Sequence, residues 1–175
     1  IWRIELGKTT AYELTTNDTY DSSPAWSPDG KYIAYTAETD NRSIALKILN
    51  IETGYSTVLF DNDYVYLDPV WSPDGSRIAY VSAEPNGYFN IYIIAVKNGK
   101  AAGYPQALTT DNQYPNSRLY FGPWDMHIQP TWSPDGQEII LLSNHDQSLG
   151  SGALWRMSSQ PSAGWTAKMI LHEQT

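Results

Sequence analysis

Residues 24–35 of the chain read PAWSPDGKYIAY, and the same motif returns as PVWSPDGSRIAY at residues 69–80 and as PTWSPDGQEIIL at residues 130–141. The tryptophans of the first two copies lie 45 residues apart, a spacing that suits a four-stranded propeller blade. The third tryptophan follows 61 residues after the second, so that unit contains one blade and an insertion of 16 residues. The repeat therefore predicts β-propeller blades.

Each motif predicts a tight turn that joins two strands into a hairpin. Proline presets φ, aspartate bonds to nearby backbone N–H groups, and glycine accepts positive φ at no steric cost. The strand Tyr32-Ile33-Ala34-Tyr35 carries apolar groups on both faces, as expected for a blade stacked between neighbours. We accordingly expect Gly75→Val to destabilise the chain more than Gly99→Val. A structural role is assigned to the repeated residues: Trp26, Asp29, Gly30, Trp71, Asp74, Gly75, Trp132, Asp135 and Gly136.

The repeat also divides the chain into units. Two further strands are expected after each hairpin, and Leu14-Thr15-Thr16 matches Leu108-Thr109-Thr110 at the end of such a unit. The first residues thus resemble the outer half of a blade, and no stretch predicts a helix. We predict an all-β fold, with residues 1–175 forming a single partial β-propeller of about three and a half four-stranded antiparallel blades. Its parts are an outer half-blade at 1–16, blades at 21–60, 68–109 and 126–172, and an inserted loop at 111–129.

Composition excludes several classes of function. The net charge is −8, and the 11 Lys and Arg residues are scattered singly, which argues against a nucleic-acid partner. No apolar run approaches the roughly 20 residues of a membrane-spanning helix, so no membrane insertion is expected. The absence of cysteine removes disulfides and thiolate metal sites. The chain begins at Ile1 inside a strand-like pattern with no visible signal peptide, and we interpret it as an excerpt.

The WSPDG motif followed by an Ile-Ala-Tyr strand resembles the repeat of TolB-like, WD-type propellers, and the resemblance covers nearly the whole chain. The segments LYFGPWDMHIQPTWSPDG (119–136) and GSGALWRM (150–157) also resemble the TolB-like propeller that precedes the hydrolase domain of some bacterial amidohydrolases. The metal-ligand histidine clusters of an amidohydrolase domain do not occur in this sequence. The resemblance implies a fold, and fold alone does not imply function.

The inserted loop carries the candidate partner-binding residues. It joins the outer strand of one blade to the inner strand of the next, on the rim opposite the SPDG turns, where propeller loops tend to carry function. Aromatic residues and arginine are enriched in interface cores. Packing on the adjoining blade is the alternative role for these side chains. The predicted set is Tyr114, Arg118, Tyr120, Phe121, Trp124, Asp125, His127 and, from the next loop, His145.

Catalytic and metal chemistry find little support. His127, Asp125, His145 and Asp146 border consecutive loops and offer ligands for a divalent metal, but they lack a diagnostic spacing. Gly150-Ser151-Gly152 is not a nucleophile elbow, and neither Ser148 nor Ser151 has the sequence context of a nucleophile. We predict that this segment is not an enzyme and binds no cofactor or metal.

Three functions remain open. The first is a non-catalytic scaffold that docks a partner protein or an attached domain, in a larger TolB-like or amidohydrolase-type protein. The second is a periplasmic TolB-type binding module that contacts a lipoprotein or peptide. The third is a propeller enzyme of the lyase or lactonase type with a channel metal, for which the inner strands offer few ligands. A periplasmic or otherwise exported location is expected, and bare blade faces predict self-association of the fragment.

Overall fold

The computed structural model describes residues 1–83, 88–110, 126–145, 152–162 and 166–172. Every regular secondary-structure element in these ranges is a β-strand, and the strands form antiparallel sheets. This confirms the predicted all-β, partial-propeller fold class. No helix in the described ranges is long and apolar enough to cross a membrane.

The strands form four sheets, which are named here by their order in the chain. The N-terminal hairpin consists of β1 (Trp2–Ile4) and β2 (Ala11–Glu13). The first blade consists of β3 (Asp21–Trp26), β4 (Tyr32–Glu38), β5 (Ile44–Asn50) and β6 (Ser56–Phe60). The second blade consists of β7 (Tyr66–Trp71), β8 (Arg77–Ser82), β9 (Asn90–Lys97), β10 (Lys100–Ala101) and β11 (Gln106–Ala107). The third blade consists of β12 (His127–Trp132), β13 (Glu138–Ser143), β14 (Ala153–Ser158) and β15 (Lys168–His172).

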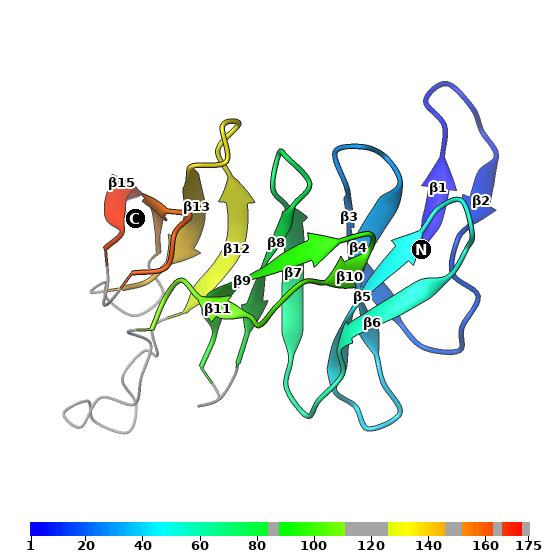
Figure 1. The fold of residues 1–175 in the computed structure, drawn as a ribbon, viewed down its shortest axis with the longest axis horizontal. Helices are drawn as coiled ribbons and strands as arrows, with labels where there is room; N and C mark the ends of the chain where they lie inside the picture. Colours follow the sequence, from blue (N-terminus) through cyan, green and yellow to red (C-terminus); the bar gives the residue numbers. More distant parts are fainter. Residues whose placement is uncertain (84–87, 111–125, 146–151, 163–165, 173–175) are drawn as a thin grey trace.

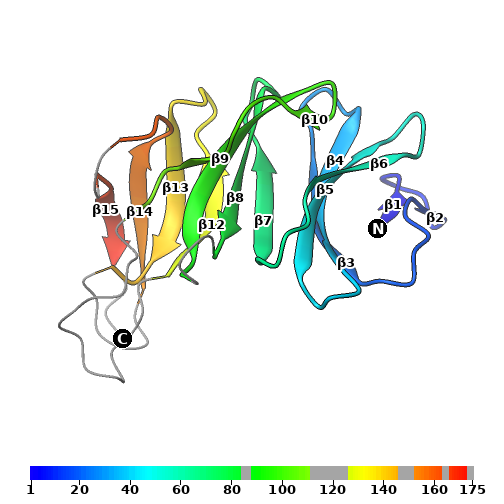
Figure 2. The same cartoon turned by 60° about the horizontal axis from the view of Figure 1, so that its bottom comes forward.

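The sheets stand side by side in chain order (Figures 1 and 2). The N-terminal hairpin lies at one end of the row and the third blade at the other. Within each blade the strands form a simple meander, so the SPDG turns share one rim and the loops between second and third strands share the opposite rim. This arrangement decides which side chains can meet at a site.

The N-terminal hairpin repeats the outer half of the second blade. Leu14 donates from its backbone N to Ile1 O at 2.9 Å, and Leu108 donates to Ile91 O at 2.8 Å. In both places the following amide shares the same carbonyl at 3.4 Å. Ile1 therefore occupies the position that Ile91 has in a complete blade.

The outer strand of the second blade differs from the expected single run. β10 and β11 pair with different parts of β9 and leave a gap between Ala101 and Gln106. The gap contains Gly103, at φ 129°, and Pro105, which has no backbone N–H to donate. The chain leaves the sheet here and returns to it, and this places Tyr104 in solvent with 92% of its surface exposed.

Each inner strand contains a bulge at the same place. Ser23, Asp68 and Gln129 have φ of 50°, 48° and 50°, and the pairing register shifts across them. Each lies three residues before the repeated tryptophan and directly before a proline, namely Pro24, Pro69 or Pro130. A bulge bends its strand and re-aims side chains, and a proline without an N–H fits the interrupted ladder.

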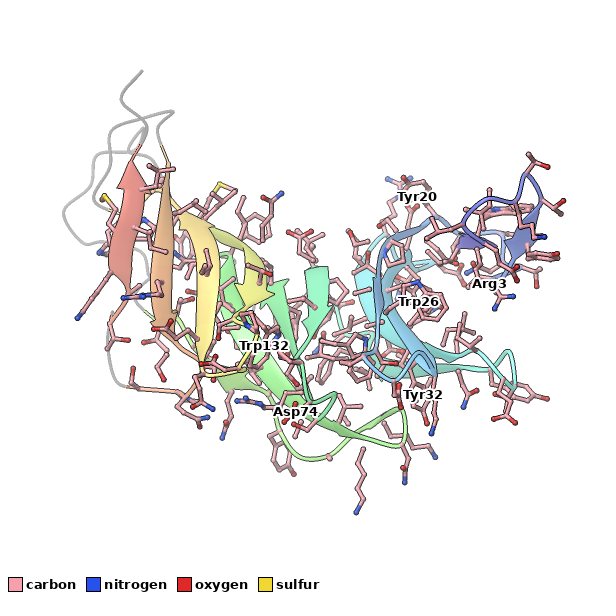
Figure 3. All side chains as sticks on the ribbon, turned by 90° about the horizontal axis from the view of Figure 1, so that it is seen from above. Arg3, Tyr20, Trp26, Tyr32, Asp74 and Trp132 are labelled. Carbon is pink, nitrogen blue, oxygen red and sulfur yellow. The ribbon has the colours of Figure 1, made fainter. Side chains whose placement is uncertain are left out.

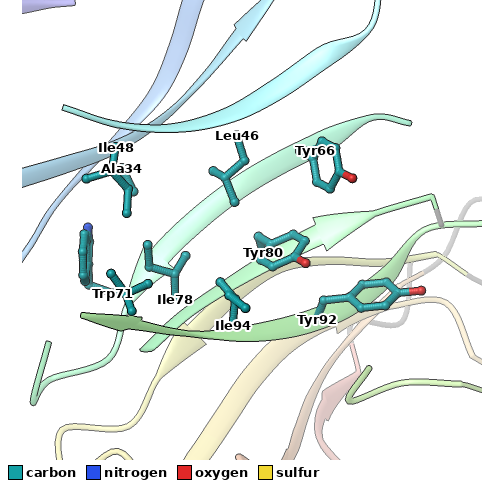
Figure 4. Packing of buried hydrophobic residues seen from close by; sticks show 10 residues of the cluster. Ala34, Leu46, Ile48, Tyr66, Trp71, Ile78, Tyr80, Tyr92 and Ile94 are labelled. Atoms are coloured by element: carbon teal, nitrogen blue, oxygen red, sulfur yellow. The ribbon is translucent and has the colours of Figure 1, made fainter. Parts of the chain in front are cut away.

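Neighbouring blades are joined by one repeated contact. Trp71 donates from Nε1 to Ala25 O of the first blade at 3.1 Å, and Trp132 donates to Val70 O of the second at 3.1 Å. Beside these bonds, Trp71 packs with Ile78 and Tyr80 against the first blade (Figure 4). The first-blade residues of this cluster are Ala34, Leu46 and Ile48. Because one face of each blade is completed by its neighbour, the hydrophobic cores lie between blades.

In the first two blades, the residue six positions after the repeated tryptophan completes the contact with the next blade. Tyr32 stacks on Trp71, with ring centroids 6.3 Å apart. Arg77 takes the same position against Trp132, with its Cζ 4.6 Å from the ring centroid. Arg77 also donates to Gly136 O at 3.2 Å and to Ser159 O at 3.4 Å.

The expectation that valine destabilises the chain more at Gly75 than at Gly99 is wrong. Both adopt positive φ, 70° and 71°, so conformation does not separate them. A Cβ on Gly99 would lie 2.6 Å from Cε1 of Tyr32, whereas a Cβ on Gly75 would lie 3.6 Å from Cδ of Pro28. Gly99 is the less replaceable residue because the ring that stacks on Trp71 also covers it. This contact joins two blades and has no signal in the local turn sequence.

Candidate functional site

The candidate site lies on the third blade, on the rim opposite its SPDG turn. We call it the third-blade rim and define it by residues at the ends of β12, β13 and β14. Its backbone anchors are Met126 N, which donates to Asn144 Oδ1 at 2.6 Å, and His127 N, which donates to Phe89 O of the second blade at 3.2 Å. The members are Met126, His127, Ser143, Asn144, His145 and Trp155.

Ser143 forms hydrogen bonds with three other residues of this rim. Its Oγ lies 2.9 Å from His127 Nδ1 and accepts a hydrogen bond of 2.9 Å from His145 N. Its carbonyl oxygen accepts a 3.2 Å bond from Trp155 Nε1. One serine thus fixes both histidines and the indole in place. The bond to His127 needs no particular direction, because the hydroxyl can donate or accept according to the imidazole tautomer.

The two histidines pack with Trp155 as an aromatic group. The rings of His127 and His145 have centroids 6.4 Å apart, and His145 meets Trp155 edge-on at 5.8 Å. His127 is completely buried, whereas His145 is half-buried and Met126 is 39% exposed. His127 therefore shapes the rim from beneath. His145, Asn144 and Met126 are the members with surface that a partner can reach.

The other predicted partner-binding residues lie outside the described residues. They are Tyr114, Arg118, Tyr120, Phe121, Trp124 and Asp125, together with Asp146, Ser148 and Ser151 from the candidate metal and nucleophile sets. Within the described ranges, no cluster of three or more His, Cys, Asp or Glu side chains is placed to hold a metal ion.

Sequence reasoning missed Ser143, Asn144 and Trp155. A signal existed for Ser143, which lies eleven residues after Trp132, as Ser82 lies eleven after Trp71, and both serines are buried. A small polar residue at the end of the second strand is the repeated feature. Trp155 and Asn144 have no such counterpart, so their contribution depends on the fold itself.

The SPDG carboxylates are committed to their own turns. Asp74 Oδ1 accepts bonds from Ser72 Oγ at 2.5 Å and from Ser76 N at 3.0 Å, and these bonds lower its pKa to about 2. The serine and backbone donors at the equivalent positions lower the pKa of Asp29 and of Asp135. A carboxylate that accepts such bonds is held ionised and serves as turn structure.

A groove of about 440 Å³ runs along the SPDG rim between the first and second blades. The residues that line it include the stacked pair Tyr32 and Trp71 and the charged Asp29, Lys31 and Asp74. Figure 3 labels Tyr32 and Asp74 on this rim. The groove follows the repeated contact between blades, and its carboxylates are those already engaged in the turns.

Comparison with known proteins places the chain in a family. The model of the PD40 family, described as TolB beta propeller domain, matches residues 7–166. The chain therefore belongs to the TolB β-propeller domain family, and the predicted resemblance is confirmed. No curated protein sequence matches the chain.

Solved structures show the same fold at low sequence identity. TolB from Acinetobacter baumannii superposes with a TM-score of 0.72 at 19% identity, over 98% of this chain and 37% of that protein. A TolB-like protein from Agrobacterium tumefaciens gives 0.66 at 21% identity, over 89% and 50%. A puromycin-hydrolyzing peptidase from Mycobacterium tuberculosis gives 0.67 at 16% identity, over 98% and 26%. The chain thus spans at most half the length of these three proteins.

Proposed function

We propose that the chain is a non-catalytic propeller scaffold, part of a larger TolB-like protein, that docks a partner protein or an attached domain. The observation that carries the proposal is that the candidate polar side chains are used in hydrogen bonds that hold turns and loops. The three repeated carboxylates hold turns, and Ser143 and His127 hold the third-blade rim. Groups so committed stabilise a rigid surface, and loops on a rigid scaffold are suited to recognition.

The docking surface in this proposal is the third-blade rim. His145 offers an aromatic contact beside the buried Trp155, and the exposed Met126 offers a thioether contact. Aromatic residues and methionine are enriched in interface cores. Residues 111–125 lie outside the described ranges and directly precede Met126 in the sequence, and their aromatic residues and Arg118 belong to the predicted partner-binding set.

Two kinds of partner fit a scaffold of this family. An attached catalytic domain is suggested by the similarity to a puromycin-hydrolyzing peptidase, which is longer than this chain, and an amidohydrolase-type domain is our preferred example. A separate lipoprotein or peptide partner, with a periplasmic location, is suggested by the similarity to TolB. The first is preferred because the WDMHIQP segment before the third SPDG turn resembles propellers that precede hydrolase domains.

Single-cysteine crosslinking tests this proposal. The chain has no cysteine, so Met126→Cys in the parent protein, labelled with a photoreactive maleimide, reports what lies on the third-blade rim. Lys31→Cys, exposed on the opposite rim, is the matched control. We expect Met126→Cys to crosslink to the attached domain or to one partner, and Lys31→Cys not to. Equal crosslinking from both positions, or hydrolytic turnover by the isolated chain, would contradict the proposal.

A further inference from the structure

An arginine bridges the second and third blades on the SPDG rim. Arg77 donates from Nη2 to Gly136 O at 3.2 Å and from Nη1 to Ser159 O at 3.4 Å. Its Cζ lies 4.6 Å from the centroid of the Trp132 ring. This contact therefore contains a complete guanidinium site, in which an indole covers one face of the cation and two backbone carbonyls accept bonds from its edge.

The contact between the first and second blades has the same two carbonyls. The amides of Val96 and Ser159 both donate to the residue after the turn glycine, at 2.8 and 2.9 Å, so Val96 has the position of Ser159. Gly75 has the position of Gly136 in the repeated motif. Among the described residues, no side chain donates to Gly75 O or to Val96 O. Two carbonyls that would suit a guanidinium are therefore present without one.

A groove lies at this place. Its volume is about 440 Å³, and Trp71, Gly75 and Val96 are among the residues that line it; we call it the SPDG groove. Tyr32 has the sequence position of Arg77, and its ring stacks on Trp71 at 6.3 Å, but it carries no positive charge. Small-molecule sites measure roughly 300–1,000 Å³, so the SPDG groove has the size for a small ligand.

The charges along the SPDG groove favour a cation. Asp29, Asp74 and Lys31 line it, so two carboxylates accompany one amine. Turn bonds from Ser27 Oγ and Lys31 N lower the pKa of Asp29, and equivalent bonds lower the pKa of Asp74 to about 2, so both are ionised at neutral pH. Asp29 receives both turn bonds at Oδ1, and its Oδ2 accepts none from the described residues. This second oxygen remains available to a ligand.

We propose that the SPDG groove binds a small alkylguanidinium that carries a second positive charge. Its guanidinium donates to Gly75 O and Val96 O beside Trp71, as Arg77 does in the next contact. Its amine lies near the Asp29 carboxylate. The site is separate from the third-blade rim, and a small ligand gives no protein crosslink from the SPDG rim, so the scaffold function stands or falls independently.

Agmatine, an alkyl chain with a guanidinium at one end and an amine at the other, is the probe that tests this site. We expect calorimetric titration to show one agmatine bound per chain, with a dissociation constant below about 1 mM. Tyr32→Arg supplies a guanidinium from the chain itself and should weaken agmatine binding roughly tenfold or more. Tyr32→Phe keeps the ring and should bind agmatine as the unaltered chain does.

A second ligand and a second variant keep the test decisive if Tyr32→Arg does not fold. Putrescine has an amine in place of the guanidinium and should bind about tenfold more weakly, because an ammonium lacks the planar fork of donors. Asp29→Asn should weaken agmatine binding roughly threefold to tenfold, and Asp40→Asn, in an exposed loop of the opposite rim, should not. Equal binding of the two ligands, agmatine binding that survives Tyr32→Arg or Asp29→Asn, or no binding at millimolar agmatine would each overturn the proposal.

Discussion

The contact between the first and second blades and the contact between the second and third share the same tryptophan, proline and glycine interactions but differ in the residue stacked on the tryptophan. In both, a tryptophan indole donates to a carbonyl of the preceding blade, and a turn proline covers the next turn glycine. The stacked residue is Tyr32 in the first contact and Arg77 in the second. Tyr32 also packs on Gly99, while Arg77 donates to two carbonyls of the third blade.

The difference separates what the repeat must keep from what it can change. The tryptophan, proline and glycine define the spacing of the blades and recur in each copy of the motif. The stacked residue is adaptable, because a flat ring and a flat guanidinium both cover an indole face. Each stacked residue then requires its own partner in the next blade. A tyrosine ring requires a glycine beneath it, and a guanidinium requires carbonyl acceptors around it.

The largest expected effect is the loss of the tryptophan in the more deeply buried contact. Trp71 is 6% exposed and packs in the core cluster between the first two blades, so Trp71→Ala should lower the free energy of unfolding by about 3–5 kcal/mol. Trp132 is only half-buried, and Trp132→Ala should cost less. Urea unfolding of both variants measures the difference. Equal losses would mean that the two contacts do not differ in burial as the structure shows.

The next effect concerns the two turn glycines. Gly99→Ala must move the Tyr32 ring as well as strain the backbone, and we expect a loss of about 2–4 kcal/mol. Gly75→Ala meets Pro28 at an ordinary contact distance and should lose about 1–2 kcal/mol. The double variant Gly99→Ala/Tyr32→Ala should recover part of the first loss. No recovery would show that the clash with Tyr32 is not the cause.

A smaller effect on stability distinguishes the two stacked residues, Arg77 and Tyr32. Arg77→Met keeps an apolar stem but removes the bonds to Gly136 O and Ser159 O and the charge over Trp132, for an expected loss of about 1–2 kcal/mol. Tyr32→Phe retains the stacked ring and should change stability by less than about 0.5 kcal/mol. Thermal unfolding compares the two. A larger loss for Tyr32→Phe would reverse our assignment of a ring contact at one place and polar bonds at the other.

The smallest effect is the acid dependence of the SPDG turn. The folded-state pKa of Asp74 is about 2, below the ordinary value of 3.8, so its stabilisation is complete at neutral pH and is lost as pH falls from about 4 to 2. Because Asp74 is exposed, we expect only about 1 kcal/mol or less. Asp74→Asn should remove the share of Asp74 from that part of the stability profile and leave the shares of Asp29 and Asp135, measured by urea unfolding at each pH. Asp40→Asn, in an exposed loop, is the control and should leave the profile as it is.

The sequence predicts the blades well because the WSPDG motif is a local signal. Proline, aspartate and glycine at fixed positions determine a turn wherever they occur, and the flanking strands follow from their apolar pattern. The bulges at Ser23, Asp68 and Gln129 were missed, although a proline two residues before each tryptophan marks them. A proline inside a strand is a readable signal for an interrupted ladder.

The rest depends on contacts between blades, which no local pattern specifies. Gly99 is harder to replace than Gly75 because of Tyr32, which lies 67 residues earlier in the chain. At the candidate site, the sequence named His127 and His145, but their burial and the central position of Ser143 follow from three strands meeting at one rim. The exposure of Trp26 depends likewise on what faces it, although its motif matches the other two copies.

Hydrogen exchange of the three repeated indole N–H groups tests the central claim most directly, because the claim is that each tryptophan is completed by the preceding blade. Nuclear magnetic resonance of the isolated chain, with indoles assigned from Trp→Phe variants, resolves Trp26, Trp71 and Trp132 separately. We predict slow exchange for Trp71 and Trp132, whose Nε1 groups bond to Ala25 O and Val70 O, and fast exchange for the exposed Trp26. Equal exchange rates for all three indoles would contradict the repeated contact between blades.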